Sequence, residues 1–83
     1  MRTISDFEIT KIKNDVPSQV GEQIISFRKL KNLSQTKLAE IVGKDRQYIY
    51  KIEKGKVTPN IVTLAIICKA LQITLTELFK NVE

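Results

Sequence analysis

The sequence predicts an all-α fold: a compact domain of five short helices, preceded by a short N-terminal arm or strand. Three observations predict it. Apolar residues recur at spacings of three and four after residue 18, and residues that cap or stop helices separate these segments at short intervals. In addition, 83 residues suffice for only one small domain. We therefore divide the chain into an N-terminal segment, residues 1–17, and a helical domain, residues 18–83.

The N-terminal segment differs in pattern from the rest of the chain. Residues 7–12 are rich in β-branched side chains, and Phe7 and Ile9 alternate with polar neighbours. This pattern favours a short strand, which Pro17 ends because the residue before a proline avoids helical geometry. A lone strand is not stable in water. The segment therefore either pairs with the same strand of a second copy or remains a flexible arm, and the sequence leaves both alternatives open.

Five helices follow, each bounded by residues suited to its ends. Serine, threonine and aspartate are good N-caps, whereas glycine and asparagine tolerate the left-handed conformation that stops a helix. We expect helices over residues 18–31, 35–42, 46–54, 59–71 and 75–79. Their N-caps and stop residues are Asn32, Ser34, Gly43, Asp45, Gly55, Thr58 and, in a capping box with Glu77, Thr74.

Composition excludes most catalytic and metal chemistry. The chain has 14 basic and 9 acidic residues, a net charge of +5, no histidine and one cysteine. It can therefore form neither a histidine-containing triad nor a histidine metal site, and the single Cys68, expected at the edge of the core, can form no internal disulfide. No apolar run could span a membrane and no apolar signal core is present. We expect a cytoplasmic protein that is not an enzyme and takes no metal, cofactor or small-molecule ligand.

Residues 34–55 contain the most informative pattern. An eight-residue helix, a three-residue turn with Gly43 and a nine-residue helix form a helix-turn-helix unit. Ala39 is small enough for the point at which the two helices cross. Ile49 and Ile52 mark the buried face of the second of these helices. Its outward face then carries basic and polar side chains: Arg46, Gln47, Tyr50, Lys51 and Lys54.

The order and spacing of many residues match one known family. The matching positions run from Gly21 to Phe79, and they include Arg28, Leu33-Ser34-Gln35, Leu38-Ala39, Gly43, Tyr48-Ile49, Ile52-Glu53-Lys54-Gly55, Pro59, Leu64 and Ala70-Leu71. This stretch closely resembles the Cro and phage-repressor type of helix-turn-helix regulator, the XRE family. The resemblance implies a five-helix fold, a third helix that enters the DNA major groove, and binding as a dimer.

The resemblance also implies roles for individual residues. It places the base-contacting positions on Arg46, Gln47, Tyr50 and Lys51. It implies that Gln35 bonds a phosphate and braces Gln47, and that Arg28 and Glu53 form a partly buried ion pair. The chemistry agrees, because arginine suits the two acceptors of guanine and glutamine suits adenine. Arg46 contacts either a base or a phosphate. Tyr50 either packs against a thymine methyl group or merely covers the helix.

Positive charge is concentrated around the same helices. Residues 34–56 hold six basic and three acidic residues, whereas residues 57–83 have no net charge. A cluster of this kind is typical of a surface that binds phosphates. We expect the phosphate contacts to come from Gln35, Thr36, Lys44, Lys54 and Lys56.

A second surface is predicted on the fourth helix. With Leu64, Ile67 and Leu71 turned inward, Val62 and Ile66 face solvent four residues apart. Exposed apolar residues on one helix face favour an interface, unless the helix is packed more deeply. We expect a dimer interface around Val62, Ile66, Ile73 and the last helix.

Two functions remain. The first is a sequence-specific transcriptional regulator, in its simplest form a repressor, that binds double-stranded DNA as a homodimer on a near-palindromic operator. The alternative is an antitoxin-type or controller-type protein that binds a protein partner, such as a toxin, and autoregulates through the same helix-turn-helix.

Overall fold

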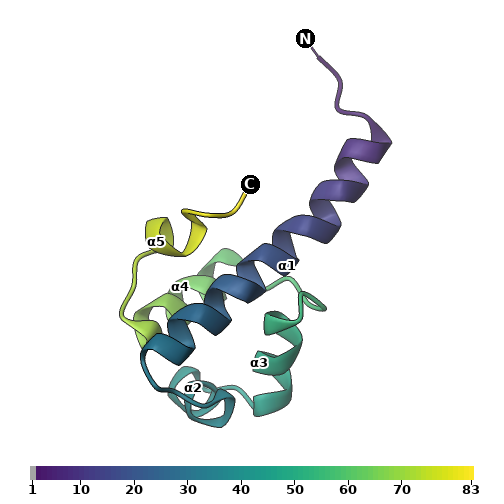
Figure 1. The fold of residues 1–83 in the computed structure, drawn as a ribbon. Coiled ribbons are helices and arrows are strands. Elements are labelled where there is room, and N and C mark those ends of the chain that lie inside the picture. Colours follow the sequence, from purple (N-terminus) through teal and green to yellow (C-terminus); the bar gives the residue numbers. More distant parts are fainter. Residues whose placement is uncertain (1) are drawn as a thin grey trace.

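The computed structural model describes residues 2–83 and folds them into five α-helices (Figure 1). These are α1 (Asp6–Leu30), α2 (Gln35–Val42), α3 (Arg46–Glu53), α4 (Ile61–Leu71) and α5 (Leu75–Phe79). No strand occurs within this range, which confirms the all-α prediction. The four shorter helices gather around the C-terminal half of α1, and its N-terminal half projects beyond them (Figure 1).

Helix α1 begins twelve residues earlier than the sequence pattern suggested, so the predicted strand at residues 7–12 is wrong. The physical reason is a capping box that the sequence analysis missed. The Ser5 hydroxyl accepts a hydrogen bond from the backbone N–H of Glu8, and the Glu8 carboxylate accepts one from the backbone N–H of Ser5, both at 3.1 Å. This bond from the Ser5 backbone lowers the pKa of Glu8. Lys11 and Asp15, one turn apart, form an ion pair at 2.7 Å.

Pro17 lies inside α1 and does not end it. A proline inside a helix removes one backbone hydrogen bond and costs about 3 kcal/mol. Here the backbone of α1 lies against the α3–α4 connection, because a Cβ atom on Gly55 would be 2.9 Å from Cα of Ser18 and 3.4 Å from the carbonyl carbon of Pro17. Helix α1 therefore crosses the boundary that we predicted between residues 17 and 18 without interruption.

The other helix ends follow the predicted signals with three adjustments, of which the first is that α1 ends at Leu30, one residue early. Asn32, Gly43 and Gly55 adopt the left-handed conformation, with φ of 57°, 74° and 72°. Ser34, Asp45 and Thr74 are the N-caps of α2, α3 and α5. Helix α3 ends at Glu53, one residue early. Helix α4 begins at Ile61, because the side chain of Asn60, and not that of Thr58, accepts the capping bond from the backbone N–H of Thr63, at 2.8 Å.

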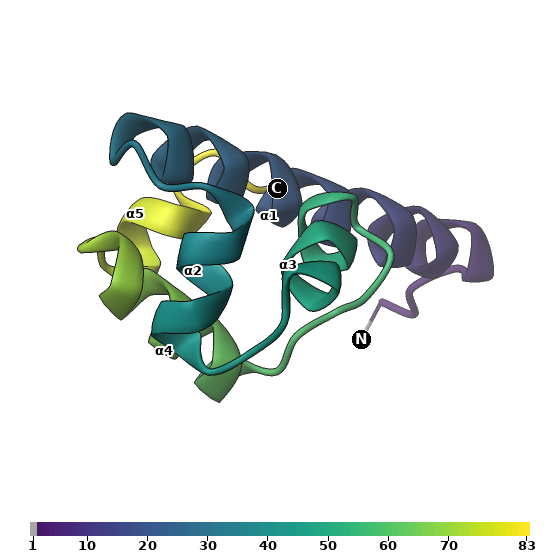
Figure 2. The ribbon, with the colours of Figure 1, turned by 90° about the horizontal axis from the view of Figure 1, so that it is seen from below.

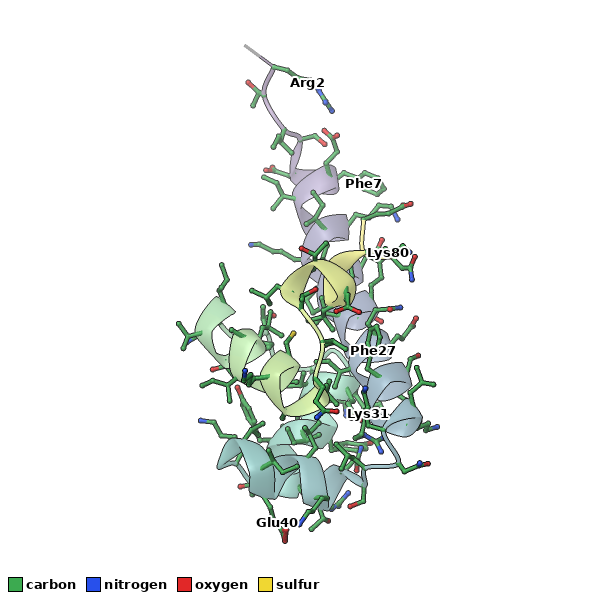
Figure 3. The ribbon with its side chains drawn as sticks, turned by 90° about the vertical axis from the view of Figure 1, so that its left-hand side faces the viewer. Arg2, Phe7, Phe27, Lys31, Glu40 and Lys80 are labelled. Atoms are coloured by element: carbon green, nitrogen blue, oxygen red, sulfur yellow. The ribbon has the colours of Figure 1, made fainter. Side chains whose placement is uncertain are left out.

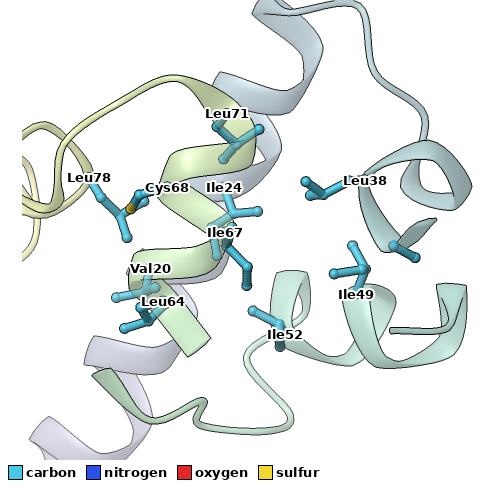
Figure 4. Packing of buried hydrophobic residues seen from close by; sticks show 11 residues of the cluster. Val20, Ile24, Leu38, Ile49, Ile52, Leu64, Ile67, Cys68, Leu71 and Leu78 are labelled. Carbon is cyan, nitrogen blue, oxygen red and sulfur yellow. The ribbon is translucent and has the colours of Figure 1, made fainter. Parts of the chain in front are cut away.

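One hydrophobic core joins all five helices (Figure 4). Seven of its side chains are essentially inaccessible to water: Ile24, Leu38, Ile49, Ile52, Ile67, Leu71 and Leu78. They come from every helix, so each helix depends on the others for burial. Ala39, the small residue predicted at the crossing of α2 and α3, is 2% exposed.

Cys68 lies within this core and not at its edge. It is 2% exposed, and burial raises the pKa of its thiol. Because the thiolate is the reactive form, we expect the native protein to react with a thiol reagent at least tenfold more slowly than the unfolded chain. Labelling with Ellman's reagent in buffer and in denaturant measures the ratio. Equal rates would show that Cys68 is accessible in the native state.

Candidate nucleic-acid interface

Helices α2 and α3 lie next to each other beneath α1, joined by the turn at Gly43–Asp45 (Figure 2). Ile49 and Ile52 of α3 are both 1% exposed and fix which face of the helix is buried. Arg46, Gln47 and Lys51 are consequently exposed, as predicted. Tyr50 is half-buried. Since Arg46 and Gln47 occupy the first turn of α3, both lie at the end of the helix that a DNA groove would meet first.

The predicted phosphate-binding residues surround this helix. Gln35 and Thr36 form the first turn of α2, where backbone N–H groups lack partners within the helix. Lys44 lies in the turn before α3, and Lys54 and Lys56 follow its last residue. All of these side chains are exposed except that of Gln35, which is half-buried.

A partly buried ion pair connects α1 to the end of α3, which confirms the pairing that the resemblance implied. Arg28 donates to the two carboxylate oxygens of Glu53, from Nε at 2.6 Å and from Nη2 at 3.1 Å. Its remaining Nη1 group donates to the carbonyl of Leu33 at 2.9 Å. The side chains of Arg28 and Glu53 are only 11% and 2% exposed. Their charges are therefore shielded from water and depend on each other.

Gln35 extends this ion pair to the surface of α3. Its Nε2 group donates to Oε1 of Glu53 at 2.9 Å. Its Oε1 atom accepts a hydrogen bond from Nη1 of Arg46 at 3.0 Å. We expected Gln35 to brace Gln47, but the bond goes to Arg46 instead. Glu53 can only accept hydrogen bonds, so it fixes the orientation of the Gln35 amide and turns the amide oxygen towards Arg46.

Aromatic rings hold three of the lysines close to α3. The ammonium group of Lys44 lies 5.2 Å from the centre of the Tyr48 ring, and those of Lys54 and Lys56 both lie 5.9 Å from the Tyr50 ring. Such cation–π contacts contribute about 0.5–1 kcal/mol at exposed sites. The contact of Tyr48 is one that the sequence analysis missed, although the spacing of four residues from Lys44 is a usable signal.

The family model for the helix-turn-helix family HTH_3 matches residues 24–78, which include α2 and α3 and most of the core. The chain belongs to this family. It is thus a member of the XRE-type helix-turn-helix proteins, which are DNA-binding transcriptional regulators.

Named relatives of this helix-turn-helix protein include control proteins. It is 39% identical to control protein C.MunI of a Mycoplasma species over 71 residues, which cover 84% of this chain and 96% of that protein. It is 38% identical to control protein C.SmaI of Serratia marcescens over 64 residues, 77% of this chain and 76% of that protein. The structure is similar to that of the restriction-modification controller protein C.AhdI of Aeromonas hydrophila, with 33% identity, a TM-score of 0.73, and coverage of 76% and 96% of the two chains.

The predicted dimer residues of this helix-turn-helix protein differ in exposure. Val62 and Ile66 of α4 are 70% and 47% exposed, so their side chains are available to a partner. Ile73, in the α4–α5 connection, is half-buried and packs against the core.

None of the described helices combines the length and the apolar character needed to cross a membrane.

Proposed function

We propose that this chain is a sequence-specific regulator that binds double-stranded DNA as a homodimer, of the type that controls restriction–modification genes. The observation that supports it best is the hydrogen-bonded series from Arg28 through Glu53 and Gln35 to Arg46. It anchors a base-reading guanidinium at the first residue of α3 to the buried interior. A preorganised reader loses less side-chain entropy on binding than a free one.

In this proposal, two copies of α3 enter successive major grooves. Half-sites on a near-palindromic operator are then about 34 Å apart. Arg46 donates two hydrogen bonds to a guanine, and Gln47 bonds an adenine. Lys51 and Tyr50 contact neighbouring bases. Backbone N–H groups at the start of α2 donate hydrogen bonds to a phosphate in the same arrangement, because the helix dipole favours an anion there.

Lysines and polar side chains around α3 complete the proposed footprint by contacting phosphates. These contacts position the protein without reading the sequence. They come from Gln35, Thr36, Lys44, Lys54 and Lys56. The likeness to control protein C.MunI and to the controller C.AhdI supports promoters of restriction–modification genes as the target. A dimer that covers such a promoter represses it.

Selection of bound duplexes from a randomised DNA pool at physiological salt tests the proposal. We expect one twofold-symmetric motif. Gln47→Ala should relax the preference at one base pair of each half-site, a loss of about 1–3 kcal/mol of discrimination. Lys54→Ala should weaken binding to all sequences about equally and reduce the salt dependence by about one phosphate contact.

Lys69→Ala is the matched control, because Lys69 is an exposed lysine of α4 outside the helix-turn-helix unit. This change should leave both affinity and preference unaltered. If Gln47→Ala and Lys54→Ala had the same effect on every sequence, the assigned roles would be wrong. Recovery of no motif by the unaltered protein would reject sequence-specific binding itself.

A further inference from the structure

The first turns of α1 carry an apolar stripe where the helix projects beyond the rest of the domain. Figure 3 shows this projection, with Phe7 far from the other helices. Ile9 and Ile12 are exposed, and Val16, in the next turn, packs against the core. Spacings of three and four place these three residues on one helix face, the pattern of a helix-pairing seam. Because exposed apolar residues gathered on one face mark interaction sites, the stripe indicates a surface that another molecule covers.

The stripe leads into an apolar groove of about 190 Å³. The groove lies where α1 meets the α3–α4 connection and α5, and its walls include Val16, Pro17, Pro59 and Phe79. The exposed apolar face of α4 begins directly after the groove, at Ile61. Phe79, which is 37% exposed, is itself part of the groove wall, and Ile61 follows the wall residue Pro59 by two positions in the sequence.

The exposed apolar area of α4 and α1 can be compared with the area that a stable dimer interface buries. The α4 residues Ile61, Val62 and Ile66 are 47–74% exposed. At about 120 Å² for a fully exposed aliphatic side chain, which is about 3 kcal/mol divided by about 25 cal/mol per Å², they offer roughly 230 Å². Adding Ile9, Ile12 and Phe79, which are 37–53% exposed, raises this to roughly 400 Å². Interfaces are about 60% apolar, and a stable one buries about 800 Å² per partner, of which roughly 480 Å² is apolar. The α4 face alone is therefore too small for a stable dimer, whereas the combined surface comes close to the required area.

We propose that a second copy of this chain covers the combined surface, with the two α1 helices antiparallel across a twofold axis near Ile12. Ile9 precedes Ile12 by three residues and Val16 follows it by four, so Ile9 of each copy lies opposite Val16 of the other, at the mouth of its groove. A twofold axis makes every such contact reciprocal. Lys13, beside the axis, extends its ammonium group to water along its aliphatic stem. The inference rests on the homodimer of the proposed function and adds α1 to its interface.

Ile12→Glu tests this arrangement by placing two carboxylates at the axis. We expect dimerisation at least tenfold weaker than that of the unaltered chain, measured by sedimentation equilibrium. Asn14→Glu is the matched control, because Asn14 is exposed on another face of the same turn of α1. It should dimerise normally. Circular dichroism should show unchanged helix content for both variants, since Ile12 is 53% exposed and lies outside the core.

Disulfide crosslinking through a single introduced cysteine tests the position of the twofold axis independently. Ile12→Cys should form a disulfide between copies under mild oxidation, whereas Asn14→Cys should not. The unaltered chain should stay unlinked, because Cys68 is buried. Equal dimerisation by Ile12→Glu and the unaltered chain would overturn the α1 pairing, as would equal crosslinking at residues 12 and 14. A chain that is monomeric at all concentrations would overturn it as well.

DNA binding separates this inference from the proposed function. Ile12→Glu should bind a duplex with one half-site as tightly as the unaltered chain, and bind the full palindrome at least tenfold more weakly. Normal binding of the palindrome by this variant would overturn the α1 pairing and leave the DNA-binding proposal intact. If the unaltered chain showed no sequence preference, the proposed function would fail, and sedimentation would still decide the α1 pairing.

Discussion

Glu53→Gln should lower the free energy of unfolding by about 3 kcal/mol or more, the cost of leaving a buried charge without its partner. The carboxylate accepts bonds from Arg28 and Gln35, and its side chain is 2% exposed. An amide at this position removes the compensating charge and turns an NH₂ group towards donors. A domain of this size has a total stability near the lower end of about 5–15 kcal/mol, so the variant should be close to unfolding. Urea denaturation followed by circular dichroism measures the loss.

Glu40→Gln provides the matched control for this prediction. Glu40 also pairs with a basic residue, Lys37, but at 3.8 Å and with both side chains more than 60% exposed. An exposed pair contributes little, so the change should cost less than about 0.5 kcal/mol. Arg28→Met should destabilise as Glu53→Gln does, and the double variant should cost less than the sum of the two. Additive losses, or similar losses for Glu40→Gln and Glu53→Gln, would contradict a coupled buried pair.

Glu53→Gln should affect DNA recognition as well as stability. Without the carboxylate of Glu53, the amide of Gln35 is free to rotate. Nothing then holds its oxygen in the orientation that accepts the hydrogen bond from Arg46. Under conditions in which Glu53→Gln is still folded, we therefore expect a weaker preference at the base pair that we propose Arg46 contacts. The phosphate contacts proposed for Lys54 and Lys56 do not involve these hydrogen bonds and should persist.

Local signals explain why much of the fold could be predicted from the sequence. The N-caps Ser34, Asp45 and Thr74 each bond a backbone N–H three residues later. Gly43 takes up a left-handed conformation within its own turn. Such features depend on a few neighbouring residues, so the order of the helices and the helix-turn-helix unit follow directly from the chain.

The start of α1 was mispredicted because two local signals conflicted. The pattern of residues 7–12 and the presence of Pro17 favoured a strand and a break, whereas Ser5 and Glu8 formed a capping box. Helix α1 continues through Pro17, and its backbone there lies against the α3–α4 connection, where a Cβ atom on Gly55 would be 2.9 Å from Cα of Ser18. This close approach joins residues far apart in the sequence. Packing of this kind has no local signature.

Prediction of the candidate site from local sequence signals was limited in the same way. The exposure of Arg46, Gln47 and Lys51 could be predicted, because the spacing of Ile49 and Ile52 defines the buried face of α3. The bonds of Gln35 to Glu53 and Arg46 could not. They join residues 18 and 11 positions apart, and they depend on how closely α1, α2 and α3 pack. The resemblance indicated that Gln35 is a brace, but it named Gln47 as the braced side chain, whereas the bond goes to Arg46.

That close packing depends on Gly21, and Gly21→Ala should lower the free energy of unfolding by about 3 kcal/mol. A Cβ atom at this position would overlap the backbone carbonyl oxygen of Glu53 and lie 2.6 Å from that of Ile52. Backbone atoms cannot move aside as a flexible side chain can, so α1 and α3 must separate, and overpacking of this kind costs about 1–3 kcal/mol or more. Separation would also stretch the bonds between Arg28 and Glu53. Urea denaturation measures the loss.

The sign of the Gly21→Ala effect makes the test decisive. In a helix without this contact, alanine would be more stable than glycine by about 0.5–1 kcal/mol, so a stabilised variant would show that α1 and α3 are not in close contact at this point. Gly43→Ala is the informative comparison, because a Cβ there meets no atom within 4 Å and only the positive φ of 74° opposes it. We expect a cost of about 1 kcal/mol for that change. Because Gly43 lies away from the α1–α3 contact, Gly21→Ala should weaken operator binding by more than Gly43→Ala does, even under conditions in which both variants are folded.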